Sequence, residues 1–142
     1  MKINVVPATE KEVSEFDDRE WHGVDNEHYG HTVHWNVEHF RFMALSDDKI
    51  LGTVSGKHEG GVLYIDDLMV GSEARGKGVG TPLLDKAEEV GKKYKAHKTH
   101  LITGDGWKAN DFYSKHGFKK IAKLPNHHFH EDFVIYEREI KY

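Results

Sequence analysis

The chain has 142 residues, a formal net charge of −4 and no cysteine. A chain of this length buries enough surface for one core, so we predict a single domain over residues 1–142. Without cysteine there is neither a disulfide nor a catalytic thiol. We expect a cytoplasmic protein with no membrane partner, because we find no signal-like N-terminus and no apolar run that could cross a bilayer. The mixture of charges argues against nucleic acid as the main partner and suits a cationic ligand.

The N-terminal third is the least regular part of the sequence. Ile3 to Val6 has the composition of a short strand, which Pro7 ends. Thr9 is placed to cap a helix that runs through Phe16, with Glu12 in position for a capping box. Between Asp17 and His39 the hydrophobic pattern is poor, and we expect one or two short helices there.

The rest of the chain alternates between strand and helix signals. Turn residues separate three consecutive strands and predict an antiparallel meander, which is followed by two strand–helix alternations and a closing hairpin. The predicted strands are 40–45, 50–57, 62–70, 99–103, 119–123 and 133–140, and the predicted helices are 82–94 and 107–116. The order β-α-α-β-β-β-α-β-α-β-β is that of an α+β fold. It gives a mixed, mostly antiparallel sheet of about seven strands with about four helices.

A glycine-rich loop joins the third strand of the meander to the next helix. Gly76, Gly78 and Gly80 let backbone N–H groups turn toward an anion, and the helix adds the positive end of its dipole. This pattern fits a phosphate cradle and, from these residues alone, fits a surface turn equally well. The loop lacks the Ser or Thr after Gly-Lys that an NTPase needs, and Thr81 stands where a dinucleotide fingerprint requires a small residue.

Two segments together resemble the GCN5-related N-acetyltransferase (GNAT) family. Arg75, Gly78 and Gly80 fill the positions of its acyl-CoA signature, Arg or Gln, two residues, Gly, one residue, Gly or Ala. Residues 109–118 resemble the family's later helix with its Phe-Tyr and Gly-Phe pairs. One position departs, because Gly106 stands where the family has Asn. The resemblance implies the GNAT fold and acetyl-CoA as co-substrate, with no metal.

The resemblance also implies the residues of the site. In the family a backbone N–H on the strand before the loop binds the thioester carbonyl, and the loop binds the phosphates. Tyr113 occupies the position of the family's general acid, although a tyrosine beside Phe112 on a helix is by itself more typical of a packed core residue. The implied cofactor-binding residues are Leu68, Met69, Val70, Arg75, Gly76, Lys77, Gly78, Val79, Gly80, Thr81, Asn110 and Phe112.

Asp66 and Asp67 are the carboxylates nearest in sequence to the cofactor loop. An amine must lose its proton before it attacks a thioester, so the site needs a base or a water path to one. Neighbouring residues of a strand point to opposite faces, so only one of the two aspartates can face the site directly. Each is equally well explained as the partner of a nearby lysine or backbone group. The pair also resembles the acidic strand of polyamine acetyltransferases.

Twelve histidines make a metal site the main rival to this interpretation. His28, His31 and His34 recur every three residues, and three more histidines lie between residues 127 and 130. Neither group has a known zinc spacing. Solvated or substrate-lining imidazoles are the more ordinary explanation.

The sequence therefore predicts an N-acetyltransferase that transfers the acetyl group of acetyl-CoA to a primary amine of a small molecule or peptide by direct attack. The catalytic candidates are Tyr113, Asp66 and Asp67. The alternatives are a CoA-binding module without catalysis and a histidine-rich metal-binding protein. The sequence allows a homodimer without predicting one.

Overall fold

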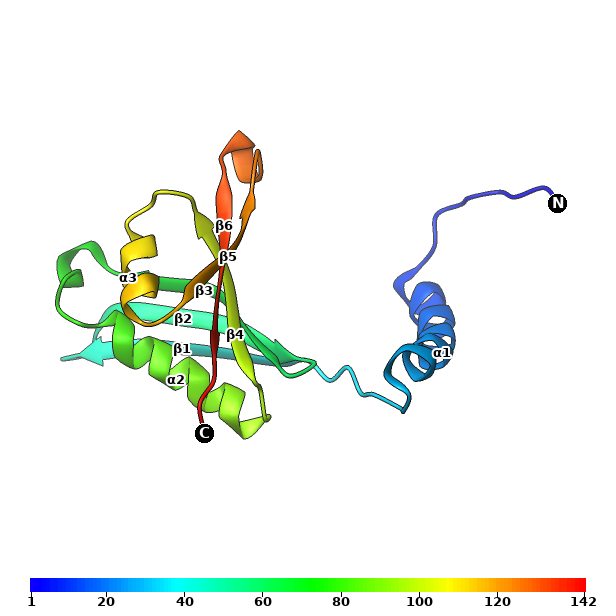
Figure 1. The fold of residues 1–142 in the computed structure, drawn as a ribbon, viewed down its shortest axis with the longest axis horizontal. Coiled ribbons are helices and arrows are strands. Elements are labelled where there is room, and N and C mark those ends of the chain that lie inside the picture. Colours follow the sequence, from blue (N-terminus) through cyan, green and yellow to red (C-terminus); the bar gives the residue numbers. More distant parts are fainter. The chain divides into compact units, whose positions relative to one another are not determined.

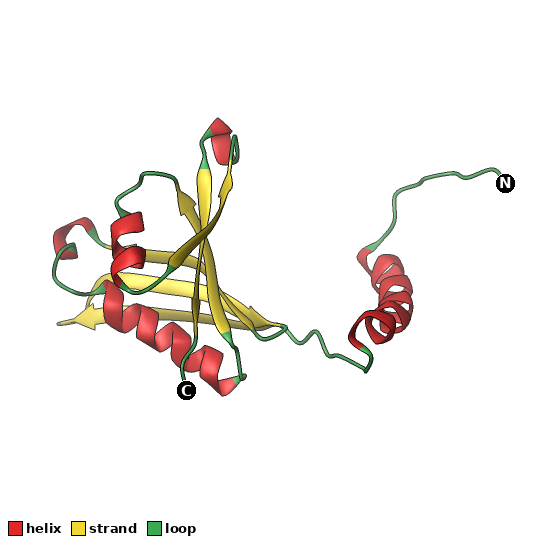
Figure 2. Cartoon of the chain, in the orientation of Figure 1, coloured by secondary structure: helices red, strands yellow, loops and turns green.

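The computed structural model describes residues Met1–Tyr142, which divide into two units, Met1–Trp35 and Asn36–Tyr142. The first unit holds one helix, and the second holds a six-stranded sheet with two helices (Figures 1 and 2). The elements are α1 (Glu10–Tyr29), β1 (Glu38–Ser46), β2 (Lys49–Glu59), β3 (Val62–Val70), α2 (Gly80–Lys93), β4 (Lys98–Gly104), α3 (Ala109–Lys115), β5 (Lys119–Leu124) and β6 (Phe133–Glu139), with short 3₁₀ turns at Ser72–Ala74 and His128–His130.

In the first unit, α1 is one long helix where we predicted a short one and further fragments. Thr9 and Glu12 form the predicted capping box, in which the Thr9 N–H donates to the Glu12 carboxylate at 3.0 Å and the Glu12 N–H to Thr9 Oγ1 at 3.2 Å. The helix ends at Gly30, whose left-handed φ of 74° lets its N–H reach the carbonyl of Asn26. The prediction failed because polar residues interrupt the hydrophobic pattern in mid-helix, and Gly30 was the overlooked stop signal.

The predicted strand Ile3–Val6 is absent, and the count of seven strands is therefore wrong by one. These residues have no regular structure and are exposed, as Val5 is at 95%. A strand needs a neighbour to pair its backbone groups, and the first unit contains none. The expected four helices are three, because α1 replaces two or more short ones. The α+β class and the mostly antiparallel mixed sheet are confirmed.

In the second unit the strand order is β1-β2-β3-β4-β6-β5, and only β3 and β4 are parallel. Alternate strand residues such as Leu63, Leu101 and Tyr136 are buried on one face, where they form a single core with Leu84 of α2 and Tyr113 of α3. Both helices of the second unit therefore cover the same face of the sheet. The opposite face carries exposed apolar side chains, among them Met43, Met69 and Ile102. No helix in either unit is both long and apolar enough to cross a membrane.

Candidate active site

The glycine loop has the geometry of an open anion cradle. Gly76 and Gly78 have φ values of 76° and 79°, in the left-handed region that favours glycine, and a Cβ at either would meet no atom within 4 Å. The loop leads directly into α2. No side chain caps the N-terminus of that helix, and its first turn has no acidic residue. The N–H groups at the start of α2 therefore have no side-chain partner and carry the positive end of the helix dipole.

The two cations of the loop differ in how firmly they are held. The Nε of Arg75 donates to the carbonyl of Val70 at 3.3 Å, which ties the guanidinium group to the end of β3. Lys77 is exposed and makes no ion pair. It lines a cleft of about 460 Å³, together with Lys49 and Glu73, which pair with each other at 2.6 Å. One cation is thus hydrogen-bonded to the backbone beside the cradle, and the other is exposed without an ion-pair partner.

Three other predicted cofactor residues lie in the contact between α2 and α3. A Cβ on Gly80 would lie 2.9 Å from the ring of Phe112, so the missing side chain is what lets the helices approach. The hydroxyl of Thr81 lies 2.9 Å from His116 Nε2, while His116 Nδ1 lies 2.8 Å from the Phe112 carbonyl. A carbonyl only accepts, so Nδ1 carries the proton and Nε2 accepts from Thr81. We call this contact the α2–α3 seam.

Asn110 is also held by internal contacts. Its Nδ2 donates to the carbonyls of Gly104 at 2.8 Å and Trp107 at 2.7 Å, and its Oδ1 accepts from the Tyr136 hydroxyl at 2.7 Å. Both amide hydrogens are therefore used within the protein. Asn110 holds the start of α3 against the end of β4 and the middle of β6.

Strands β3 and β4 pair only over three residues each. Their register is Val62 with Lys98 through Tyr64 with His100, although β3 continues to Val70 and β4 to Gly104 (Figure 1). The β2–β3 register also shifts at this point, so that Asp66 is an extra, bulged residue. Beyond it, Leu68, Met69 and Val70 have no strand partner on the β4 side. A bulge followed by unpaired backbone is the arrangement that can present N–H groups to a carbonyl oxygen.

Tyr113 lies in the core of the second unit, on the face of the sheet that α2 and α3 cover. Its side chain packs against Phe118 at a ring-centroid distance of 5.4 Å and against Tyr136 at 6.0 Å, and only 6% of the residue is exposed. Burial raises the pKa of Tyr113 to about 12, and the charge of Asp67 adds to the shift. Among the catalytic candidates, Asp67 is thus the one whose charge reaches Tyr113, but no hydrogen bond joins the two residues. Asp66 and Asp67 are both exposed.

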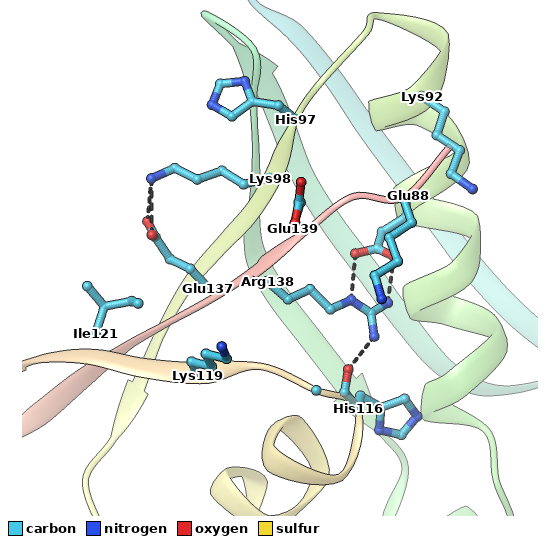
Figure 3. A pocket seen from close by; sticks show the side chains of 12 residues that line it. Glu88, Lys92, His97, Lys98, His116, Lys119, Ile121, Glu137, Arg138 and Glu139 are labelled. Carbon is cyan, nitrogen blue, oxygen red and sulfur yellow. Dashed lines mark hydrogen bonds and ion pairs between the residues drawn. The ribbon is translucent and has the colours of Figure 1, made fainter.

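A second cavity lies away from the glycine loop and contains no predicted site residue. It has a volume of about 860 Å³ and lies beside α2 and β6 (Figure 3). Arg138 there donates to both oxygens of Glu88 and to the carbonyl of His116, and Thr99 donates to Glu88 at 2.6 Å. These internal bonds satisfy the half-buried charges of Glu88 and Arg138, so we interpret this network as structural.

Sequence reasoning missed one pair of residues that lies close to the unpaired ends of β3 and β4. His100 Nδ1 is 2.7 Å from a carboxylate oxygen of Glu137 on β6, and Lys98 pairs with the same carboxylate at 3.0 Å. The pairing is between strands, 37 residues apart. The only sequence signal was a histidine within the short predicted strand 99–103. The histidines that we did consider, near residues 28–34 and 127–130, form no group of three or more potential metal ligands, nor does any other part of the chain.

Known proteins share both the sequence pattern and the fold. The model of the acetyltransferase (GNAT) family matches residues 10–118. The chain is 35% identical over 102 residues to N-alpha-acetyltransferase 30 of Schizosaccharomyces pombe, covering 68% of this chain and 67% of that protein. An acetyltransferase from Bacillus cereus superposes with a TM-score of 0.74 at 22% identity, over 97% of this chain and 98% of that one. An aminoglycoside 6'-N-acetyltransferase complexed with coenzyme A superposes with a TM-score of 0.67 at 19% identity, over 74% of each chain.

The chain belongs to the acetyltransferase (GNAT) family, as its two motifs predicted. Its activity class is that of an acetyl-CoA-dependent N-acetyltransferase.

Proposed function

We propose that the protein binds acetyl-CoA with the pyrophosphate in the glycine loop and transfers the acetyl group directly to a primary amine. The observation that carries this proposal is the open loop itself. Gly76 and Gly78 leave free space in front of their backbone, at a helix start that no side chain caps. Oriented N–H groups and a helix dipole attract a phosphate at such a place. Arg75 and Lys77 add positive charge beside it.

The unpaired backbone of β3 supports the position of the thioester. Leu68, Met69 and Val70 follow the bulge and have no partner on the β4 side, so the N–H groups of this stretch that point away from β2 are candidates for the donor to the carbonyl oxygen. A fixed donor at that atom stabilises the charge that develops as the amine attacks. The exposed carboxylates of Asp66 and Asp67 are placed to attract a cationic acceptor.

The raised pKa of Tyr113 specifies how it would act. A hydroxyl with a pKa of about 12 stays protonated at neutral pH and can donate to the departing sulfur. Complete transfer of its proton to a thiolate is uphill, because an ordinary thiol has a pKa of roughly 8.5. We therefore propose that Tyr113 stabilises the thiolate by a hydrogen bond, and that the proton is supplied to the product from solvent.

The acceptor that we propose to test first is the α-amino group of a peptide. The support is the similarity to N-alpha-acetyltransferase 30. An α-amino group has a pKa of roughly 7.7–8.0, so far more of it is uncharged at neutral pH than of a lysine-like amine near ~10.4. A cytoplasmic location, a homodimer and the absence of a metal from the reaction remain predictions, and light scattering would measure the oligomeric state.

Two measurements test the proposed function. Acetyl-CoA and CoA should raise the melting temperature, by a free energy of about 2.7 kcal/mol at 100 times the dissociation constant, whereas ATP with Mg²⁺ and NAD should not. Thiol release from acetyl-CoA should then be screened with peptides, amino acids, polyamines and aminoglycosides. CoA binding without thiol release from any amine would identify a binding module without catalysis.

A further inference from the structure

We propose that His100 is the general base of the reaction and that Glu137 positions it. This inference rests on the proposed function. His100 forms the last pair with Tyr64 before β3 and β4 cease to pair, so its side chain lies at the start of the segment where the thioester is proposed to lie. The two neighbours of His100, Thr99 and Leu101, are buried on the face that α2 and α3 cover. By alternation, the imidazole therefore lies on the opposite face.

The position of His100 fits the face of the sheet from which the amine would approach. The loop, α2 and α3 hold the cofactor from one face of the sheet. An amine that reaches the same thioester from the opposite face meets His100, and Tyr113 remains on the side of the departing sulfur. A base must lie on the side from which the nucleophile arrives, because it takes the proton from that nitrogen.

The contact with Glu137 fixes which ring nitrogen is available. Burial raises the pKa of Glu137, but hydrogen bonds from His100 and Lys98 outweigh it and hold that pKa below its ordinary value. The carboxylate is therefore ionised at neutral pH and can only accept, so His100 Nδ1 carries the proton at 2.7 Å. This leaves the lone pair of Nε2 free to accept a proton. The same logic orients the histidine of a Ser-His-Asp triad.

The surroundings leave the imidazole partly accessible. The His100 side chain is 25% exposed and that of Glu137 18%. The ring of Tyr64 packs edge-on against His100 at a centroid distance of 5.3 Å. The titratable and charged groups that surround the pair are Tyr64 on β3, Lys57 over its ring, Lys98 on β4, and Lys119 on β5 opposite Glu137. No other histidine of the chain has its ring bonded to a carboxylate.

In the proposed step the amine nitrogen bonds to the acetyl carbon while its excess proton passes to His100 Nε2. The C–S bond then breaks, and CoA leaves as a thiolate that Tyr113 stabilises. His100 returns its proton to solvent, so the net products are the amide, CoA and the regenerated imidazole. Asp66 and Asp67 are weaker candidates, because an ordinary aspartate, with a pKa of roughly 3.9, is a poor base at neutral pH.

The first test uses steady-state kinetics with the amine that gives the highest rate in the thiol-release screen. His100→Ala should lower kcat by about 10²–10⁴-fold, as expected for loss of a general base, and should leave the KM for acetyl-CoA nearly unchanged. His97→Ala is the matched control, because His97 is an exposed histidine on the same segment whose ring is not bonded to a carboxylate. A CoA-induced rise in melting temperature equal to that of the wild type would show that each variant is folded. A kcat within twofold of the wild type in folded His100→Ala would overturn the proposal.

The second test separates positioning from packing. Glu137→Gln removes the negative charge beside the imidazole, so the acid-side inflection of kcat, expected between about pH 5 and 8, should move to lower pH. A lower kcat with an unmoved inflection would reject the role of Glu137. If no amine gives thiol release, the proposed function fails. The orientation of the His100 ring can still be tested, by ¹⁵N NMR of the full chain. The His100 ring should be protonated at Nδ1, and a proton on Nε2 would contradict the proposal.

Discussion

The glycine loop and the α2–α3 seam both contain glycines of the acyl-CoA signature, yet these glycines serve opposite purposes in the structure. In the loop, Gly76 and Gly78 have positive φ values and open space in front of them. In the seam, Gly80 is a glycine because the Phe112 ring occupies the space that its Cβ would need. One sequence motif can therefore contain glycines of two kinds. Some leave space for a ligand, and others leave space for a side chain of the protein itself.

The largest expected effect is the loss of CoA binding in Gly78→Val. A branched side chain there would fill the cradle and resist a φ of 79°. We expect the affinity for CoA to fall more than 100-fold while unfolding remains cooperative, although the strained backbone costs roughly 1–3 kcal/mol of stability. Isothermal titration calorimetry and thermal unfolding check this. Unchanged affinity in a folded variant would mean that the loop is only a turn.

Tyr113→Phe should have the next largest effect, on turnover. The phenyl ring keeps the packing against Phe118 and Tyr136, so the variant removes only the hydroxyl. Because that hydroxyl is proposed to act mainly in the transition state, kcat should fall about 10²-fold, near the lower end of general acid effects, with CoA affinity unchanged. Steady-state kinetics with the best acceptor measures both. A loss of CoA binding alone would make Tyr113 a cofactor contact.

Gly80→Val is the counterpart of Gly78→Val and should act on stability. Its Cβ would lie 2.9 Å from the Phe112 ring, so the seam must open. Overpacking of this kind costs about 1–3 kcal/mol of the free energy of unfolding. Chemical denaturation measures that cost, and titration calorimetry should show an affinity for CoA within tenfold of the wild type. If this variant loses CoA binding as completely as Gly78→Val does, Gly80 belongs to the cofactor site and the distinction between loop and seam is wrong.

The sequence predicted the glycine turn and the helix α3 of the seam for a physical reason. Gly78 and the pair Phe112–Tyr113 follow from local backbone and packing rules that a short segment carries by itself. The meander β1–β3 and the order of the elements after it were predicted correctly for the same reason. The contact of His100 with Glu137 was not predictable, because it depends on which residues of β4 and β6 stand opposite each other in the sheet. Likewise, the residues next to Asn110 in the sequence do not show whether its side chain contacts a cofactor or holds α3 in place.

The titration of Tyr113 should reveal its burial directly. Absorbance near 295 nm, compared between the wild type and Tyr113→Phe, should show one phenol that ionises near pH 12, where an ordinary tyrosine ionises near ~10. Since the folded state retains this proton at pH values where the unfolded state has lost it, stability should fall between pH ~10 and 12. Bound CoA should shield the hydroxyl further. An ordinary titration would mean that Tyr113 is more accessible than the fold indicates.

The smallest expected effect is that of a substitution at Thr81. It tests whether this residue belongs to the seam or to the cofactor site. Thr81→Val keeps the shape of the side chain but leaves His116 Nε2 without its donor. A lost hydrogen bond of this kind costs about 0.5–1.5 kcal/mol of stability, and the affinity for CoA should stay within threefold. A double-mutant cycle with His116→Asn should show coupling of about 0.5 kcal/mol or more, because the two side chains contact each other. If Thr81→Val instead weakens CoA tenfold or more without a change in stability, the hydroxyl belongs to the cofactor site. The cofactor site would then extend from the loop to Thr81, in the first turn of α2.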